Sequence, residues 1–183
     1  SKNPSTRNLQ RSVFNEQDAI AHIAAIIPQY NVTHAILSSV VNNDTEVADY
    51  LSSQVKFIRL TNATPLPIMN AYSTPNTLGA DRIACVVGAN NVYPNNNCLV
   101  ICVGTAITYN YITKNRAFRG GNITPGIHLR FKALNDYTDK LPYVSVNGDN
   151  TLLGYDTETS IRSGVIWGIA SEIDGMIDLY KKQ

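Results

Sequence analysis

The sequence of 183 residues predicts an α/β protein in which helices cover a parallel sheet. In the first half, apolar residues recur at helical spacing over 18–27 and 44–51. Each of these segments is followed by a short run typical of a strand, 35–37 and 55–60. A long helical pattern over 160–180 closes the chain. The order helix, strand, helix, strand favours parallel pairing with helical crossovers.

The composition changes after residue 60, between the elements of the first half and the rest of the chain. Residues 61–80 are rich in Thr, Pro and Asn and predict a loop, after which a helix is expected over 81–89. Pro94 and the asparagines after it form a second break. We expect this break to separate an N-terminal lobe, 1–95, from a C-terminal lobe, 96–183.

The predicted C-terminal lobe begins with two strand-like runs, 98–103 and 107–113. Residues 104–106 separate them and are few enough for a tight turn. Apolar residues of the second run alternate with others, so that 107, 109 and 111 are expected on one face. Glycines and prolines over 120–126 predict a loop, and a helix is expected over 127–137.

Composition excludes several classes of protein. The net charge is +1 and no basic run occurs, so binding to nucleic acid or to an anionic membrane has no electrostatic support. No apolar run reaches the roughly 20 residues of a membrane helix, and the polar N-terminus does not resemble a signal peptide. We therefore expect a cytoplasmic protein.

The three cysteines, Cys85, Cys98 and Cys102, form no CxxC pair and lie in apolar stretches. This pattern predicts buried free thiols in a reducing compartment. The three histidines are scattered, with no spacing typical of a zinc site.

The first segment that could carry chemistry runs from Tyr72 to Arg82. Gly79 permits close backbone approach, and the helix that follows offers unpaired N–H groups. Asp81 could accept a hydroxyl proton, and Arg82 could pair with a carboxylate or phosphate. The alternative is structural: Asp81 caps the helix and Arg82 is solvated or bridging.

The second segment is the strand–turn–strand around Gly104 and Thr105. Such a turn can present backbone N–H groups and hydroxyls to an anion, although an ordinary hairpin has the same sequence features. It is not a Walker A loop, since GxxxxGK[ST] does not occur. Residues 119–126 predict a constrained loop, and Thr157 before the last helix fits an N-cap.

Taken together, these segments resemble the type III pantothenate kinases, also called the Bvg accessory factor family, from about Val32 to the end of the chain. The matching positions are Tyr72, 78–82, 104–108, 120–126, Ala133, Leu134, Thr138, Leu141, Pro142, Gly154, Thr157, Ile161, Gly164, Gly168, Ile173 and Asp174. That many matches in order and spacing are specific to the family.

The resemblance implies the two-lobed actin-like ATPase (ribonuclease H-like) fold, each lobe a sheet flanked by helices. It implies that ATP phosphorylates the primary hydroxyl of pantothenate, the first step toward coenzyme A, with Mg²⁺ and a monovalent cation, K⁺ or NH₄⁺. It also implies a homodimer with the substrate pocket at its interface. Such phosphoryl transfer needs positioning, charge neutralisation and a carboxylate that takes the hydroxyl proton.

The resemblance also implies a role for single residues. Asp81 is expected to be the general base. Thr105, with Gly104 beside it, is expected to contact ATP. The pantothenate site is expected to be lined by Tyr72, Gly79, Ala80, Asp81, Arg82 and Thr157.

The chain departs from the family at two acidic positions. Cys102 stands where the family has a cation-binding Asp, and Asn110 where it has another Asp. A thiol is a poor ligand for a hard cation, and an amide keeps the shape of a carboxylate without its charge. These changes motivate an alternative function, a family member that binds pantothenate without turnover.

The family's phosphate loop, Asp-x-Gly-Asn-Thr, has no counterpart in residues 1–17, and its last strand and helix have none before Gln183. A parallel sheet without these strands would expose apolar edges. We therefore expect the chain to be part of a longer protein.

Overall fold

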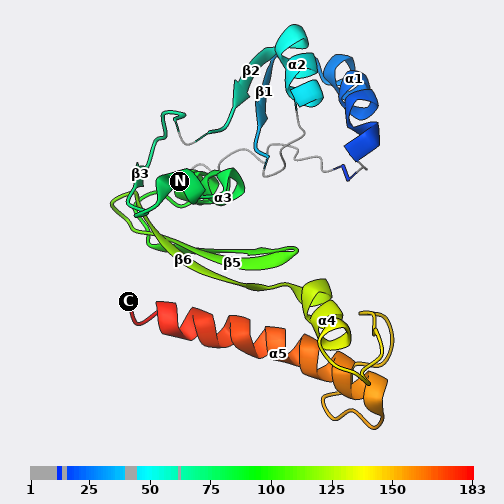
Figure 1. Cartoon of the computed structure of the whole chain (residues 1–183). Coiled ribbons are helices and arrows are strands. Elements are labelled where there is room, and N and C mark those ends of the chain that lie inside the picture. Colours follow the sequence, from blue (N-terminus) through cyan, green and yellow to red (C-terminus); the bar gives the residue numbers. More distant parts are fainter. Residues whose placement is uncertain (1–11, 14–15, 40–44, 62) are drawn as a thin grey trace. The chain divides into compact units, whose positions relative to one another are not determined.

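The computed structural model describes residues 12–13, 16–39, 45–61 and 63–183 (Figure 1). The chain divides into two units, Ser1–Thr64 and Pro65–Gln183. Both combine a sheet with helices, so the predicted α/β class is confirmed.

The first unit has the predicted order of helix, strand, helix and strand. Its elements are η1 (Glu16–Asp18), α1 (Ala19–Gln29), β1 (His34–Leu37), α2 (Thr45–Gln54) and β2 (Lys56–Arg59). The two strands pair in parallel, with His34 opposite Lys56. The predicted parallel arrangement is therefore confirmed here; the first residue of the helix predicted over 44–51 lies outside the described residues.

The second unit is built on a four-stranded sheet in the order β3-β6-β5-β4. Its strands are β3 (Met69–Asn70), β4 (Cys98–Val103), β5 (Ala106–Ile112) and β6 (Ala117–Pro125). Its helices are η2 (Pro75–Thr77), α3 (Ala80–Val92), α4 (Ile127–Asp136) and α5 (Thr157–Tyr180). β5 is antiparallel to both β4 and β6, and β3 joins β6 in parallel.

The loop predicted over 120–126 is wrong, because most of this segment belongs to strand β6. Its glycines serve close approach between strands rather than a loop. Gly121 has φ 152° and lies opposite Asn110, where an added Cβ would come within 1.8 Å of the Tyr109 carbonyl oxygen. The loop predicted over 61–80 also holds the short elements β3 and η2.

The division between the two units falls at Thr64 and Pro65, whereas the sequence predicted a lobe boundary at residue 95. The reason is packing. Helix α3 precedes that break, yet it packs on β4 and β5, which follow it. How the two units correspond to family lobes stays a prediction.

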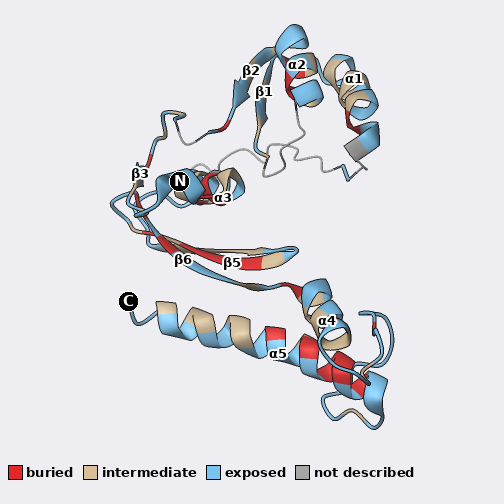
Figure 2. Ribbon diagram, in the orientation of Figure 1, coloured by how far each residue is buried: buried red, intermediate tan, exposed pale blue. Residues whose placement is uncertain are grey.

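The sheet of the second unit has helices on both faces, α3 on one and α5 on the other (Figure 1). Residues of β5 alternate between these faces, as predicted, and most of the strand is buried (Figure 2). The core beside α5 contains Ile107, Tyr109, Phe131, Val144, Ile161, Val165 and Ile169. The core beside α3 contains Ile68, Leu78, Ile83, Val86, Ile112 and Phe118.

Candidate functional site

Two neighbouring charged residues in the first turn of α3, Asp81 and Arg82, lie in different surroundings. Gly79 is the N-cap, with φ −61° and ψ 133°, and Asp81 lies exposed in the first turn. The interpretation of Asp81 as the helix cap is therefore wrong. Its charge still suits the positive end of the helix dipole. Arg82 turns inward and is only 6% exposed.

Arg82 is held from three sides. Its Nε donates a hydrogen bond of 2.6 Å to Oδ1 of Asn110. Its guanidinium carbon lies 5.7 Å from the ring centre of Tyr72 and 5.9 Å from that of Phe118. Its Nη2 is buried without a hydrogen-bond partner. The alternative of a solvated Arg82 is thus wrong, and an N–H donor remains open at a desolvated position.

Asn110 orients this guanidinium. It is fully buried on β5, and its Nδ2 donates to Oγ1 of Thr108 at 3.0 Å and to the Val100 carbonyl oxygen at 3.3 Å. With its Nδ2 directed to these two acceptors, the Asn110 side chain presents its Oδ1 to Arg82. A carboxylate could not make both donations, so the amide matches its surroundings.

Tyr72 reaches the same place from the segment before α3. Its ring stacks on Phe118 with the centres 6.1 Å apart and an angle of 21° between the planes. It also lies against Gly120, where φ is 95° and an added Cβ would meet the tyrosine ring at 3.0 Å. Tyr72 and Arg82 are therefore brought together, and Gly79, Ala80 and Asp81 adjoin them through the chain.

Thr157 belongs to another part of the unit. It is exposed in the first turn of α5, which covers the sheet face opposite to α3 (Figure 1). Its predicted role as N-cap is wrong by one residue. Asp156 is the N-cap and accepts a hydrogen bond of 2.8 Å from the backbone N–H of Thr159.

The predicted tight turn between β4 and β5 is confirmed. The backbone N–H of Gly104 donates to the Ala106 carbonyl oxygen at 3.1 Å, and that of Gly126 donates to the Thr105 carbonyl oxygen at 2.9 Å. Gly126 lies so close that an added Cβ would be 2.0 Å from the Gly104 carbonyl oxygen. Thr105 is exposed, so its hydroxyl is accessible to a ligand.

Cys102, near the end of β4, faces Cys85 of α3. Its Sγ lies 3.2 Å from Sγ of Cys85, and all three cysteines are free. They are half-buried rather than buried, which corrects one part of the prediction. Burial, the hydrogen bond and charge of Cys102, and the charge of Asp81 together raise the pKa of Cys85 to about 11.

This thiol pair does not fit a hard cation, because K⁺ and Mg²⁺ prefer oxygen ligands. Throughout the described residues, no group of three or more His, Cys, Asp or Glu side chains could hold a metal ion. In the same part of the chain, no helix has both the length and the apolar character needed to cross a bilayer.

A second polar cluster, centred on Glu172 of α5, was not predicted. The carboxylate accepts hydrogen bonds from the Tyr109 hydroxyl at 3.0 Å and the Thr124 hydroxyl at 2.6 Å, and it pairs with Arg130. Burial alone would raise the pKa of Glu172, but these donors outweigh it and lower the pKa. Burial and the Glu172 hydrogen bond raise the pKa of Tyr109 to about 12. The four residues come from β5, β6, α4 and α5, so no sequence spacing could reveal the cluster.

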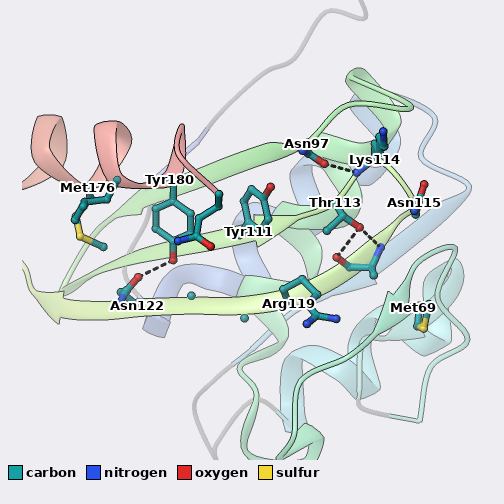
Figure 3. A pocket seen from close by; sticks show the side chains of 15 residues that line it. Met69, Asn97, Tyr111, Thr113, Lys114, Asn115, Arg119, Asn122, Met176 and Tyr180 are labelled. Carbon is teal, nitrogen blue, oxygen red and sulfur yellow. Dashed lines mark hydrogen bonds between the residues drawn. The ribbon is translucent and has the colours of Figure 1, made fainter.

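A cavity of about 910 Å³ lies among β5, β6, the turn between them and the end of α5 (Figure 3). The Tyr180 hydroxyl donates to Oδ1 of Asn122 at 2.6 Å, and the backbone N–H of Lys114 donates to Oδ1 of Asn97 at 2.8 Å. No residue predicted from the sequence to bind a ligand lines this cavity. The candidate site is instead the cluster around Arg82.

Comparison with known proteins gives consistent results. The sequence model of the type III pantothenate kinases matches residues 5–179. A type III pantothenate kinase of Phocaeicola vulgatus is 44% identical over 155 residues, covering 84% of this chain and 64% of the relative. One of Bacteroides fragilis is 40% identical over 170 residues, covering 92% and 70%. The chain thus spans about two thirds of the length of these relatives.

Among solved structures, the chain is similar to a conserved candidate transcriptional activator of the Baf family from Campylobacter jejuni. The TM-score is 0.54 at 23% identity, over 84% of this chain and 68% of that one. At this identity the likeness concerns the fold.

Proposed function

The chain belongs to the type III pantothenate kinase family, and we propose on this basis that the whole protein phosphorylates pantothenate with ATP. The product is phosphopantothenate, and the reaction is the first step of coenzyme A biosynthesis. The proposal includes the two-lobed actin-like fold and a cytoplasmic location. ATP supplies the phosphoryl group; the residues described above bind and orient the acceptor.

The observation that carries this proposal is the open donor on Arg82. Nη2 is buried and unpaired, which costs about 1–3 kcal/mol unless a ligand accepts its hydrogen bond. The guanidinium is already oriented by Asn110 and by two aromatic rings. A carboxylate is the natural acceptor for such a group, and pantothenate carries one.

Asp81 is proposed as the general base. Its carboxylate is exposed, whereas the neighbouring Arg82 points inward, so the two groups leave the helix turn in different directions. Pantothenate carries its carboxylate and its primary hydroxyl at opposite ends. A substrate bound by its carboxylate at Arg82 could then offer its hydroxyl proton to Asp81.

The turn at Gly104 and Thr105 is proposed to contact the phosphates of ATP. Two observations support this proposal. Thr105 is exposed, and the backbone of Gly126 packs closely against the turn and donates a hydrogen bond to it. Mg²⁺ and a monovalent cation belong to the family pattern, but Cys102 does not fit a monovalent cation.

The test is pantothenate-dependent formation of ADP by the full-length protein. Replacement of Arg82 by Gln is expected to raise KM for pantothenate by about tenfold to a hundredfold, because a charged hydrogen bond is lost. Asp81→Asn is expected to lower kcat by about a hundredfold or more. Lys132→Gln, on an exposed side chain of α4, is the control. An unchanged KM in Arg82→Gln contradicts the carboxylate contact.

A second candidate function is pantothenate binding without turnover, favoured by Cys102 and Asn110. The amide of Asn110 is hydrogen-bonded to Arg82, Thr108 and Val100, which supports pantothenate binding at Arg82. The Cys102 thiol is a poor ligand for a hard cation, which supports the absence of turnover. Calorimetry with pantothenate and with ATP separates the two candidates. Pantothenate binding without nucleotide binding favours the second. Turnover that appears only in Cys102→Asp, with K⁺ present, also favours it.

A homodimer is proposed as the assembly. The loop before α5 exposes three large apolar side chains: Leu152 at 75%, Leu153 at 85% and Tyr155 at 73%. Two hydrogen bonds hold this loop against α5. Trp167 Nε1 donates to the Asn150 carbonyl oxygen, and Ser163 Oγ donates to the Leu152 carbonyl oxygen. An exposed apolar patch of this kind is typical of an interface between subunits. Thr157 follows the patch by two residues in the sequence. The proposal agrees with the family resemblance, which implies a homodimer with the substrate pocket at its interface.

A further inference from the structure

We propose that Cys85 and Cys102 form a redox-active dithiol that closes into an intramolecular disulfide when the protein meets a peroxide. The disulfide would be a covalent link between α3 and β4. This proposal does not depend on kinase activity, since it concerns two thiols and not the binding of pantothenate or ATP.

The first support is geometric. The two sulfur atoms are 3.2 Å apart, whereas a disulfide bond is about 2.0 Å long. Closing this difference of about 1.2 Å is within the range of small side-chain rotations. Both residues lie in the second unit, on elements that pack against each other. Both are half-buried, so a small oxidant can reach them.

The third cysteine shows that this arrangement is specific to the pair. Cys98 lies on the same strand and the same sheet face as Cys102, four residues earlier. It packs beside the core that contains Ile83 and Phe118. Its thiol contacts the Asn96 carbonyl oxygen at 3.8 Å, which is a backbone atom and not a second sulfur. Cys98 therefore serves as an internal control.

The chemistry balances with hydrogen peroxide as the oxidant. Cys102 is assigned the first step, because the raised pKa of Cys85 disfavours the Cys85 thiolate. The Cys102 thiolate attacks a peroxide oxygen and becomes a sulfenic acid, while the O–O bond breaks and water leaves after protonation. The second sulfur then attacks the sulfenic sulfur, the S–S bond forms and a second water leaves. The two thiols together lose two electrons and two protons, and the peroxide takes up both.

The disulfide would affect the candidate site because both cysteines lie close in sequence to residues of that site. Cys85 lies one helical turn after Asp81, and Cys102 lies two residues before Gly104. A bond between them would join α3, one turn beyond Asp81, to the strand that enters the Gly104–Thr105 turn. It would restrain the motion of α3 against β4 without filling the space around Arg82.

The experiment uses the purified chain, first reduced and then freed of reductant. It is treated with hydrogen peroxide, denatured, alkylated and analysed by intact mass and peptide mapping. Before alkylation we expect a monomer lighter than the reduced chain by two hydrogen atoms. After alkylation we expect one adduct, on Cys98, where the reduced chain carries three. Peptide mapping is expected to give a linked pair containing Cys85 and Cys102. The oxidised chain is expected to melt higher by about 5 °C, because the cross-link restricts the unfolded state.

Variants make the assignment specific. Cys85→Ser and Cys102→Ser are each expected to lose the linked peptide, and Cys98→Ser to keep it. If a serine variant fails to fold, as judged by circular dichroism, the alanine variant at the same position replaces it. Three alkylated cysteines after peroxide treatment overturn the proposal. So does a disulfide that includes Cys98, or one that forms only between two chains. Loss of kinase activity does not affect this measurement.

Discussion

Arg82 has a buried guanidinium that is only partly satisfied. Asn110 accepts a hydrogen bond from its Nε, and its guanidinium carbon lies over the rings of Tyr72 and Phe118. Its Nη2 has no hydrogen-bond partner. Packing thus orients the group before a ligand arrives, so little conformational entropy is lost on binding. This pre-orientation is the reason for placing the substrate carboxylate here.

The contact between Asn110 and Arg82 is expected to stabilise the fold. Asn110→Leu keeps the approximate size but leaves a second N–H of a buried cation unpaired. We expect the free energy of unfolding to fall by about 3 kcal/mol. Urea denaturation measures it, with Asn91→Leu on the exposed side of α3 as control, where a change below about 0.5 kcal/mol is expected. Equal effects of the two substitutions contradict the role given to Asn110.

The turn between β4 and β5 is held by the start of α4. Gly126→Ala places a Cβ 2.0 Å from the Gly104 carbonyl oxygen, so the turn or the helix must move. We expect a loss of about 2 kcal/mol or more in unfolding free energy, together with weaker ATP binding. Thermal denaturation and calorimetry measure these effects.

Gly88→Ala is the matched control for this substitution. Gly88 lies in the interior of α3, and apart from the neighbouring backbone of the helix itself nothing lies within 4 Å of an added Cβ. Alanine is expected to stabilise the protein there by about 0.5–1 kcal/mol, because glycine loses more backbone entropy in a helix. A loss of stability at Gly88 similar to that at Gly126 would show that steric contact is not the cause.

The Glu172 cluster joins two strands to two helices and is expected to make stability depend on pH. Its hydrogen bonds hold the pKa of Glu172 in the folded state below the unfolded value of about 4.3. The carboxylate therefore contributes stability above about pH 5, and this contribution is lost as the pH falls through the folded pKa.

Glu172→Gln tests this pH dependence. The difference in unfolding free energy between the unmodified chain and the variant is expected to be largest above about pH 5 and to shrink toward about pH 3. Denaturant unfolding at a series of pH values measures it. Asp178→Asn, on an exposed carboxylate of the same helix, is expected to show little change. A difference that stays constant with pH contradicts the assignment.

At the scale of the whole molecule, the exposed apolar loop before α5 is expected to lie in a dimer interface. Leu153→Glu introduces a charge at this patch and is expected to shift the protein from dimer to monomer, because burying an unpaired charge is costly. Sedimentation velocity of the full-length protein measures the shift. Val92→Glu, at a similarly exposed apolar residue at the end of α3, is expected to leave the dimer intact. A dimer that tolerates Leu153→Glu moves the interface elsewhere.

The sequence predicted local structure well. The helices α3, α4 and α5 and the strands β4 and β5 lie within a few residues of their expected places. Strand β6 was missed because Gly120 and Gly121 are typical of loops in isolation. In the folded structure the Tyr72 ring occupies the place of a side chain at Gly120, and the Tyr109 backbone occupies that at Gly121.

Family membership and the local placement of Asp81, Arg82 and the Gly104–Thr105 turn were determined by the sequence itself, because spacing along the chain encodes helices, strands and turns. Tertiary structure alone decided which partners these residues meet. Arg82 meets Asn110 28 residues away, Cys85 meets Cys102 17 away, and Tyr109 meets Glu172 63 away. Such contacts depend on how sheet and helices pack, and no local periodicity specifies them.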